Sequence, residues 1–289
     1  MILSQSLMAL RFIGTRRFLS FGLNSGLYFG KFSLIALLLM LGFSQSARAQ
    51  WFIPGDPEDW KTKLGMGAAL RPDFPGAANH VITPVPFIDL TYKKRFFLNS
   101  GRGLGLFLYG NKNGRLKYML GASVGPSLDN RSANDIEGLP KVGLTAEGRV
   151  FGEVFFDHWS VELTIAKDLL GEGHEGLKGD LGLNYTQRLQ DKKGLFRIGP
   201  QIRFGSGDYM DNFFSVTAAQ SIASGLRPFD ADAGLQSIGG RAFLSYPLFG
   251  NWNAVGAISY FRLLSDSADS PVSLDNDQIG LFAAIAYRF

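Results

Sequence analysis

The sequence predicts an all-β protein: a transmembrane antiparallel up-and-down β-barrel of about twelve strands, preceded by a cleaved signal peptide. Three observations predict this fold class. Apolar and polar residues alternate with a period of two over many segments. Several segments reach ten or more residues, longer than the usual soluble strand and suited to a tilted path across hydrocarbon. The mean hydropathy is only +0.05, too polar for a bundle of membrane helices.

The first 49 residues have the pattern of a secretory leader. They carry five of the 29 Lys and Arg and none of the 25 Asp and Glu. An apolar run, residues 32–43, precedes Ala47-Arg48-Ala49, which predicts cleavage after Ala49. The run is shorter than the ~20 residues that a spanning helix needs, although a retained N-terminal anchor is the alternative. We therefore predict a signal peptide over residues 1–49, a periplasmic N-terminal segment over 50–61 and the barrel over 62–289.

Charge and cysteine content exclude several classes of function. Without the leader, 24 basic and 25 acidic side chains remain, so no basic nucleic-acid surface is left and no nucleic-acid partner is expected. The absence of cysteine excludes disulfides and thiolate metal sites. Three histidines are too few for a histidine-rich metal centre.

The alternation predicts twelve strands. An even number lets both termini of the chain lie on the same side of the membrane. In chain order they are residues 62–71, 83–92, 95–99, 103–110, 115–124, 140–152, 158–168, 177–190, 195–206, 231–247, 252–264 and 278–289.

Four consecutive strands, from 140–152 to 195–206, combine an apolar face with a face that carries charges of both signs. A soluble sandwich has the same period, but the strand lengths favour a membrane wall whose apolar face meets lipid. The expected lipid-facing residues are Val142, Leu144, Ala146 and Val150; Trp159, Val161, Leu163 and Ile165; Leu181, Leu183, Tyr185 and Leu189; and Phe196, Ile198, Ile202 and Phe204. The expected lumen charges are Lys141, Glu147, Arg149, Glu162, Asp180, Arg188, Arg197 and Arg203. Their mixed signs favour ion pairing over a selective pore, with a solute path as the alternative.

The last strand alternates most cleanly and ends on an aromatic residue. Its apolar face holds Ile279, Leu281, Ala283, Ile285, Tyr287 and Phe289. A C-terminal strand that ends Tyr-Arg-Phe resembles the signal that outer-membrane barrels present to the barrel assembly machinery. We therefore expect that machinery and outer-membrane lipid as partners.

The connections sort by length. Residues 72–82, 125–139, 169–176, 207–230 and 265–277 form long connections, whereas 93–94, 111–114, 153–157, 191–194 and 248–251 are tight. Only 100–102 breaks this alternation. Bacterial barrels have long loops outside and short turns in the periplasm. The sequence leaves open whether 207–230 plugs the lumen or extends the wall.

Tryptophan placement agrees with this orientation. Trp60, Trp159 and Trp252 all lie beside the start of the barrel or a short turn, which gathers them at the periplasmic rim. Trp and Tyr favour membrane interfaces because one end of the side chain is apolar and the other is polar. Each alone has an ordinary core position as its alternative.

Short motifs give no catalytic, cofactor-binding or metal site. The glycine clusters 101–105 and 205–207 lack the Lys-Ser/Thr and helix of a phosphate loop, and are expected in bends and turns. Glu172, His174 and Glu175 suggest a weak cation site, but a solvated loop is the preferred interpretation. Neither His80 nor His174 has a serine in a recognisable pattern, and His158 is expected at the other rim. We predict no cofactor and no enzyme activity.

A set of short motifs is shared with one protein family. They are Gly65-x-Gly67, Pro84-Val-Pro86, Gly103-Leu-Gly105, Ser224-Gly-Leu226, Phe229-Asp-Ala-Asp-Ala233, Asn251-Trp252, Tyr260-x-Arg262-Leu263-Leu264 and Asp269-Ser270-Pro271. From about Lys63 to Phe289 the chain resembles the MipA/OmpV family of Gram-negative outer-membrane proteins, named for an MltA-interacting scaffolding protein. Residues 212–216 depart from the tyrosine-rich segment usual there.

The resemblance implies localisation in the outer membrane of a Gram-negative bacterium. Its best-described member links a murein-cleaving lytic transglycosylase to a murein synthase. We therefore hypothesise a non-catalytic scaffold for periplasmic peptidoglycan-remodelling enzymes, with those two enzymes as partners. A porin-like passive channel for small solutes is the alternative. The rim aromatics available to a partner are Trp51, Trp60, Phe155, Phe156 and Trp252.

Overall fold

The barrel forms the C-terminal unit of the chain. A computed structural model describes residues 59–111, 117–189 and 194–289. The predicted signal peptide, residues 1–49, and nearly all of the predicted periplasmic segment, residues 50–61, lie outside this range. None of the helices in the described part of the chain has the length and apolar character needed to cross a membrane.

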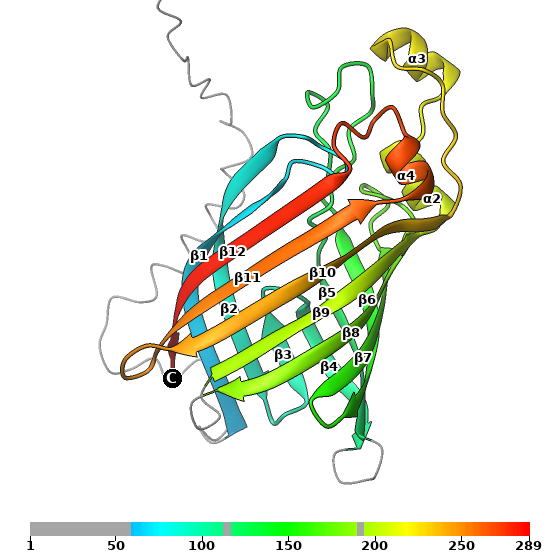
Figure 1. Ribbon diagram of the computed structural model, residues 1–289. Helices are drawn as coiled ribbons and strands as arrows, with labels where there is room; N and C mark the ends of the chain where they lie inside the picture. Colours follow the sequence, from blue (N-terminus) through cyan, green and yellow to red (C-terminus); the bar gives the residue numbers. More distant parts are fainter. Residues whose placement is uncertain (1–58, 112–116, 190–193) are drawn as a thin grey trace, which may run out of the picture. The chain divides into compact units, whose positions relative to one another are not determined.

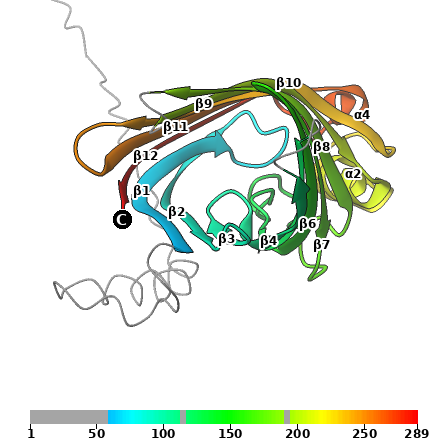
Figure 2. The same cartoon turned by 90° about the horizontal axis from the view of Figure 1, so that it is seen from below.

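Twelve antiparallel strands form the wall. They are β1 (Trp60–Pro72), β2 (His80–Tyr92), β3 (Phe96–Asn99), β4 (Gly103–Asn111), β5 (Lys117–Pro126), β6 (Ala146–Phe156), β7 (Trp159–Asp168), β8 (Leu177–Leu189), β9 (Gly194–Gly205), β10 (Gly234–Pro247), β11 (Trp252–Leu263) and β12 (Asp277–Arg288). Each pairs with the next along the chain, and β12 pairs with β1 to close the sheet (Figures 1 and 2). The predicted antiparallel barrel of about twelve strands is confirmed.

The wall turns its aliphatic side chains outward. Ile279, Leu281 and Ile285 of β12 are exposed, whereas Ala286 on the opposite face is completely buried. The lipid-facing set predicted for β7 is exposed throughout. An exposed aliphatic band around a closed sheet is what a barrel surrounded by hydrocarbon requires.

Two predicted strands are too long at their outer ends. β6 begins at Ala146 rather than at residue 140, and β10 at Gly234 rather than at 231. Val142 was predicted to face lipid, but it is buried and bridges to Arg131 in the loop before β6. Lys141 was predicted to face the lumen, but it lies exposed in that loop. The alternation of apolar and polar residues continues in the sequence before β6, because Val142 is buried among other loop residues above the barrel.

In the part of the chain that the structure describes, three helices lie at the end of the barrel that carries the long loops (Figure 1): α2 (Gly207–Phe214), α3 (Ala218–Ser224) and α4 (Ser265–Asp269). The sequence reading did not predict them. A capping box starts α3, because the Thr217 hydroxyl accepts from the Gln220 amide and the Gln220 side chain accepts from the Thr217 amide. Gly225 ends it in the left-handed region, with φ of 74°.

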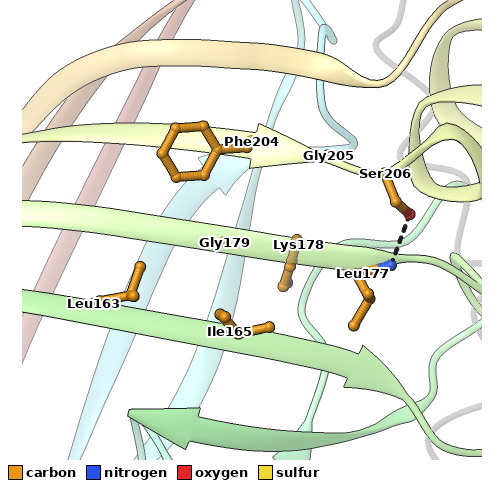
Figure 3. Close-up of a pocket in the computed structure, with 8 residues that line it drawn as sticks. All are labelled: Leu163, Ile165, Leu177, Lys178, Gly179, Phe204, Gly205 and Ser206. Carbon is orange, nitrogen blue, oxygen red and sulfur yellow. Dashed lines mark hydrogen bonds between the residues drawn. The ribbon is translucent and has the colours of Figure 1, made fainter. Parts of the chain in front are cut away.

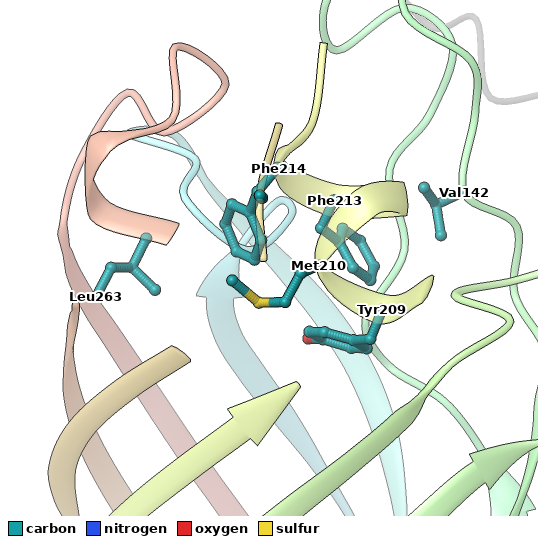
Figure 4. Close-up of a cluster of buried hydrophobic side chains, with 7 residues drawn as sticks. Val142, Tyr209, Met210, Phe213, Phe214 and Leu263 are labelled. Atoms are coloured by element: carbon teal, nitrogen blue, oxygen red, sulfur yellow. The ribbon is translucent and has the colours of Figure 1, made fainter. Parts of the chain in front are cut away.

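The long loops pack into two apolar clusters. The first joins α2 to the loop before β6 and the end of β11 (Figure 4), and consists of Val142, Tyr209, Met210, Phe213, Phe214, Ala231 and Leu263. The second joins four connections and consists of Phe74, Ala77, Leu139, Val216 and Val272. Residues 207–230 therefore form part of a packed cap at the outer end, which answers the question that the sequence left open.

The wall is uneven beside the hairpin of β3 and β4. β3 pairs with β2 only from Asp89 to Tyr92, so the rest of β2 extends beyond the hairpin. The connection 100–102, which broke the predicted alternation of loop lengths, therefore turns part-way along the wall and not at a rim.

Candidate functional site

The lumen contains ion pairs that join strands far apart in the sequence. Glu162 of β7 accepts from Arg102, in the turn before β4, and from Arg197 of β9 at 2.6 Å. Arg197 also lies 2.9 Å from Glu153 of β6. The predicted lumen charges Glu162 and Arg197 thus pair with each other, as their mixed signs indicated.

A second charged group lies under the cap. The carboxylate of Glu147, which is completely buried, lies 2.7 Å from Arg149, 2.7 Å from Lys178 and 3.0 Å from Nε2 of His174. Lys178 also pairs with Asp129, at 2.7 Å, in the loop before β6. Burial acts to raise the pKa of Asp129, but the Lys178 ammonium outweighs it and lowers that pKa overall.

Two further predicted lumen charges pair, and one does not lie in the network. Arg203 donates to Asp180 at 3.0 Å. Arg188 lies exposed near the short-turn end of β8, where the strand extends past β7. The lumen prediction is therefore wrong for Lys141 and confirmed for Glu147, Arg149, Glu162, Asp180, Arg197 and Arg203, while Arg188 lies on the inward face of β8 but outside the network. Lys178 and Asp129 belong to the network but were not among the predicted charges.

The loop after β7 is built around one carboxylate. Asp168 accepts from the backbone amides of Leu170, Gly171, Gly173 and Glu175, and from the hydroxyl of Thr145. This fold turns His174 inward, while Glu172 and Glu175 stay exposed. The prediction of a solvated loop is wrong for His174, because this side chain is completely buried. The three side chains do not converge, and no set of candidate metal ligands occurs in the described part of the chain.

Arg131 holds the cap to the loop below it. Its side chain is buried and donates to the carbonyls of Phe213 at 2.9 Å, Asn212 at 3.0 Å and Pro140 at 3.2 Å. Burial lowers the pKa of Arg131 to about 10, so the guanidinium stays charged at neutral pH. It thus compensates the last carbonyls of α2, where a helix favours positive charge.

Tyr209 connects the cap to the lumen charges. Its ring packs against His174, with centroids 5.1 Å apart, and its hydroxyl donates to Asp129 at 3.3 Å and accepts from Gln236 at 3.1 Å. Burial raises the pKa of Tyr209 well above its ordinary value, so the hydroxyl remains protonated. The cap and the lumen network are therefore one continuous hydrogen-bonded structure.

The histidines occupy three separate places. His80 begins β2, His158 lies in the turn between β6 and β7, and His174 lies under the cap. His158 meets the backbone carbonyl of Thr186, and His174 meets Glu147. The expectation that the protein is not an enzyme stays a prediction.

An apolar groove of about 260 Å³ lies on the outward face of β7, β8 and β9 (Figure 3). It forms at Gly179, where the missing side chain leaves room between Ile165 and Phe204. Because Leu163 and Leu177 also line it, the groove is part of the lipid-facing surface and not of the lumen.

The short-turn rim carries pairs of aromatic rings. Trp60 packs on Tyr92 with centroids 4.6 Å apart, and Trp159 on Tyr185 at 5.2 Å. Trp252 packs on Tyr287 at 5.2 Å. The predicted gathering of tryptophan at one rim is confirmed, except for Trp51, which lies outside the described residues. Such a belt suits the membrane interface.

Known proteins resemble this chain in sequence. The profile of the family described as MltA-interacting protein MipA matches residues 64–289. The outer membrane protein Omp26La of Vibrio anguillarum is 28% identical over 207 residues, which cover 70% of this chain and 72% of the relative. The outer membrane protein OmpV of Vibrio cholerae serotype O1 is 27% identical over 200 residues, covering 68% and 70%.

Among solved structures, the outer membrane protein OprD of Pseudomonas aeruginosa aligns with a TM-score of 0.33 and 7% identity, over 82% of this chain and 96% of that chain. The two Vibrio relatives are outer membrane proteins, and this chain folds as a closed barrel with an outward aliphatic band. The protein therefore lies in the outer membrane of a Gram-negative bacterium. Because the profile covers residues 64–289, from within β1 to the end of β12, the chain belongs to the family of the MltA-interacting protein MipA.

Proposed function

We propose that the protein is a non-catalytic outer-membrane scaffold that binds a periplasmic peptidoglycan-remodelling enzyme at its short-turn rim. The description of the family as MltA-interacting supports a lytic transglycosylase as the first partner. A murein synthase is the second partner of this proposal, as the resemblance of the sequence implies. Recognition of the C-terminal strand, ending at Phe289, by the barrel assembly machinery also remains part of this proposal.

The observation that carries the proposal is the turn between β10 and β11. Leu248 and Phe249 lie beyond the strand ends, where Phe249 is 70% exposed and Leu248 is 47% exposed. The turn is tight, because the Leu248 amide donates to Trp252 and the Trp252 amide to Phe249. Two apolar side chains held rigidly at the tip of a periplasmic turn suit an interface better than water.

The lumen supports a scaffold over a wide pore. Arg102, Glu162 and Arg197 pair inside it, and the long loops pack into apolar clusters at its outer end. Interaction surfaces, by contrast, remain exposed at the other end. A scaffold needs a stable platform and not a solute path.

Replacing Leu248 and Phe249 together by serine tests the scaffold. We expect binding to purified lytic transglycosylase to weaken on the order of tenfold or more, because truncated apolar anchors at an interface typically cost at least ~2 kcal/mol. Pull-down with the full-length barrel in detergent measures the loss. The matched control is Ile222→Ser in α3, an exposed apolar residue at the opposite end. Binding no stronger than to an unrelated barrel removes the scaffold proposal.

A passive channel is the second candidate, and one observation favours it. Arg203 and Asp180 of the lumen pair are about one third exposed, so solvent reaches part of the interior. Planar-bilayer recording separates the two functions. For a scaffold we expect no steady single-channel steps from the wild-type protein. Steady current steps at neutral pH support the channel and contradict the proposal of a scaffold without an open solute path.

A further inference from the structure

The part of β2 nearest the cap has a free edge. β1 pairs with β2 along its whole length, but β3 reaches only Asp89. Within the described ranges, residues 80–87 have no strand on the other side, and Ile88 meets only Ser100 of the hairpin turn. Figure 1 shows β3 and β4 in the part of the wall away from α2, α3 and α4. An open strand edge is unusual in a membrane barrel, because backbone groups in lipid need partners.

The free edge lies within the hydrocarbon band. In the register of the sheet, Ile82 of β2 pairs with Leu70 of β1, and Leu70 pairs with Leu281 of β12. Pro86 aligns in the same way with Met66 and Ile285. Leu281, Met66 and Ile285 are all exposed on the outward aliphatic face. The edge is thus at the depth of the acyl chains, in the half of the wall nearest the long loops.

Two prolines reduce the number of unpaired backbone groups at this edge. The Ile88 amide donates to the Ser100 hydroxyl at 2.8 Å, so it points away from β1 toward the edge. Amides of alternate residues in a strand point to the same side, which gives positions 86 and 84 the same direction. Both are proline and have no N–H to leave unpaired. Ser100 in turn donates to the Pro86 carbonyl at 2.8 Å.

The same prolines disfavour a second protein strand at this edge. A strand adds by hydrogen-bonding to alternate N–H and C=O groups, and here two successive donors are missing. A second copy of this chain, pairing edge to edge, therefore lacks these two hydrogen bonds of its ladder. Hydrocarbon needs no hydrogen bonds, so the missing donors do not disfavour it at this edge.

Behind the edge, the lumen wall has an aromatic patch, which lies between Arg71 at the outer end of β1 and the Lys63–Asp89 ion pair. Phe87 faces inward from β2 and stacks on Phe282 of β12, with ring centroids 6.3 Å apart. Both rings pack against a small buried cluster of Val255, Ala284 and Ala286. The ion pairs described above lie on β6 to β9, across the lumen from this patch. A hydrophobic chain entering here meets aromatic rings.

Both faces of β2 are exposed at the free edge. Ile82, which faces outward, is 74% exposed, and its neighbour Thr83, which faces the lumen, is exposed too. In β12 at the same register, the inward residue Phe282 is partly buried. The inward face of β2 is therefore less covered at this level than the inward face of β12.

We propose that the free edge of β2 is a lateral entrance through which an acyl chain of an outer-leaflet lipid reaches the lumen and lies against Phe87 and Phe282. The lipid surrounds the edge, the prolines keep it open, and the aromatic patch behind it matches hydrocarbon. This site is independent of the short-turn rim and of any periplasmic partner.

Photo-crosslinking tests the entrance. The full-length barrel is reconstituted in phosphatidylcholine vesicles that contain a phospholipid with a diazirine in one acyl chain, and adducts are mapped by mass spectrometry. We expect adducts on the inward residues Phe87 and Phe282, in addition to outward residues such as Ile82 and Leu281. Adducts confined to outward residues overturn the proposal, and this measurement needs no variant.

Thr83→Lys tests the route. This variant places an ammonium group at an exposed position in the entrance. We expect adducts on Phe282 to fall on the order of tenfold, because contact between a charged group and hydrocarbon is unfavourable at this depth. Adducts on Leu281 should not change. The matched control is Gln201→Lys, also inward-facing but on β9, which should leave Phe282 labelling intact. Heat-modifiable mobility on gels verifies that both variants are folded. Equal labelling of Phe282 in Thr83→Lys and wild type overturns the route.

Discussion

Gly67→Val is expected to prevent closure of the barrel. A Cβ at Gly67 meets the backbone oxygen of Ala283 at 2.3 Å and the Cβ of Ala284 at 2.6 Å. Both belong to β12, the strand whose pairing with β1 closes the sheet. Overpacking costs about 1–3 kcal/mol even where flexible side chains can yield. Here the first obstacle is backbone, so the two strands must separate and lose their hydrogen bonds.

The measurement is the folded fraction after refolding into detergent, read from heat-modifiable gel mobility. We expect little or no folded Gly67→Val under conditions in which the wild type folds. Ala68→Val is the matched control, because the adjacent side chain points outward and is exposed. It adds the same residue to the same strand but on the lipid side, and should fold normally. Equal folded fractions for the two variants contradict the close approach of β1 and β12.

The alternation of apolar and polar residues was sufficient to predict the wall. In β12 every residue predicted to face lipid from Ile279 to Ile285 lies on the outward face. The tight turn predicted at Lys93 and Lys94 is present, with both residues at positive φ, 48° and 56°. These features are local: strand faces follow from period two, and a two-residue turn follows from where the strands end.

The cap was not predictable in the same way. Val142 continues the alternation of β6, yet it packs against α2, more than sixty residues later in the chain. His174 belongs to a polar loop, but the carboxylate of Asp168 folds that loop so that the ring points inward. Both outcomes depend on contacts between distant segments, which periodicity does not encode. The free edge of β2 had one local sign, the short connection 100–102, which did not fit the order of loop lengths.

The cap and the free edge together give the lumen a specific character. Two apolar clusters pack at the outer end, and the wall beside β2 lacks a neighbouring strand among the described residues. Inward ion pairs occur on β6 to β9 and, as Lys63 with Asp89, on β1 and β2. Inward aromatic rings also occur in both regions, because Phe87 stacks on Phe282, and Phe97, Phe107 and Phe151 pack together. The interior thus combines paired charges with aromatic clusters, an arrangement unlike the uniform polar lining of a water-filled pore.

The ion pairs under the cap depend most on Glu147, and Glu147→Gln is expected to destabilise the cap strongly. The carboxylate is completely buried and is the common partner of Arg149, Lys178 and His174. Glutamine keeps the size of the side chain and a hydrogen-bonding oxygen but removes the charge. Two buried cations then share less negative charge, and breaking a buried pair typically costs about 3–5 kcal/mol.

The loss of the Glu147 charge should also destabilise the cap, because the ring of Tyr209 in α2 packs against the ring of His174. We expect the free energy of unfolding in detergent, followed by tryptophan fluorescence in urea, to fall by about 3 kcal/mol. Limited proteolysis within residues 207–230 should become faster. Glu172→Gln is the control, since Glu172 is exposed in the same loop as His174 and should change neither value. If Glu147→Gln stays within ~0.5 kcal/mol of the wild type, as surface substitutions do, then Glu147 is not the anion that holds the cap to the lumen.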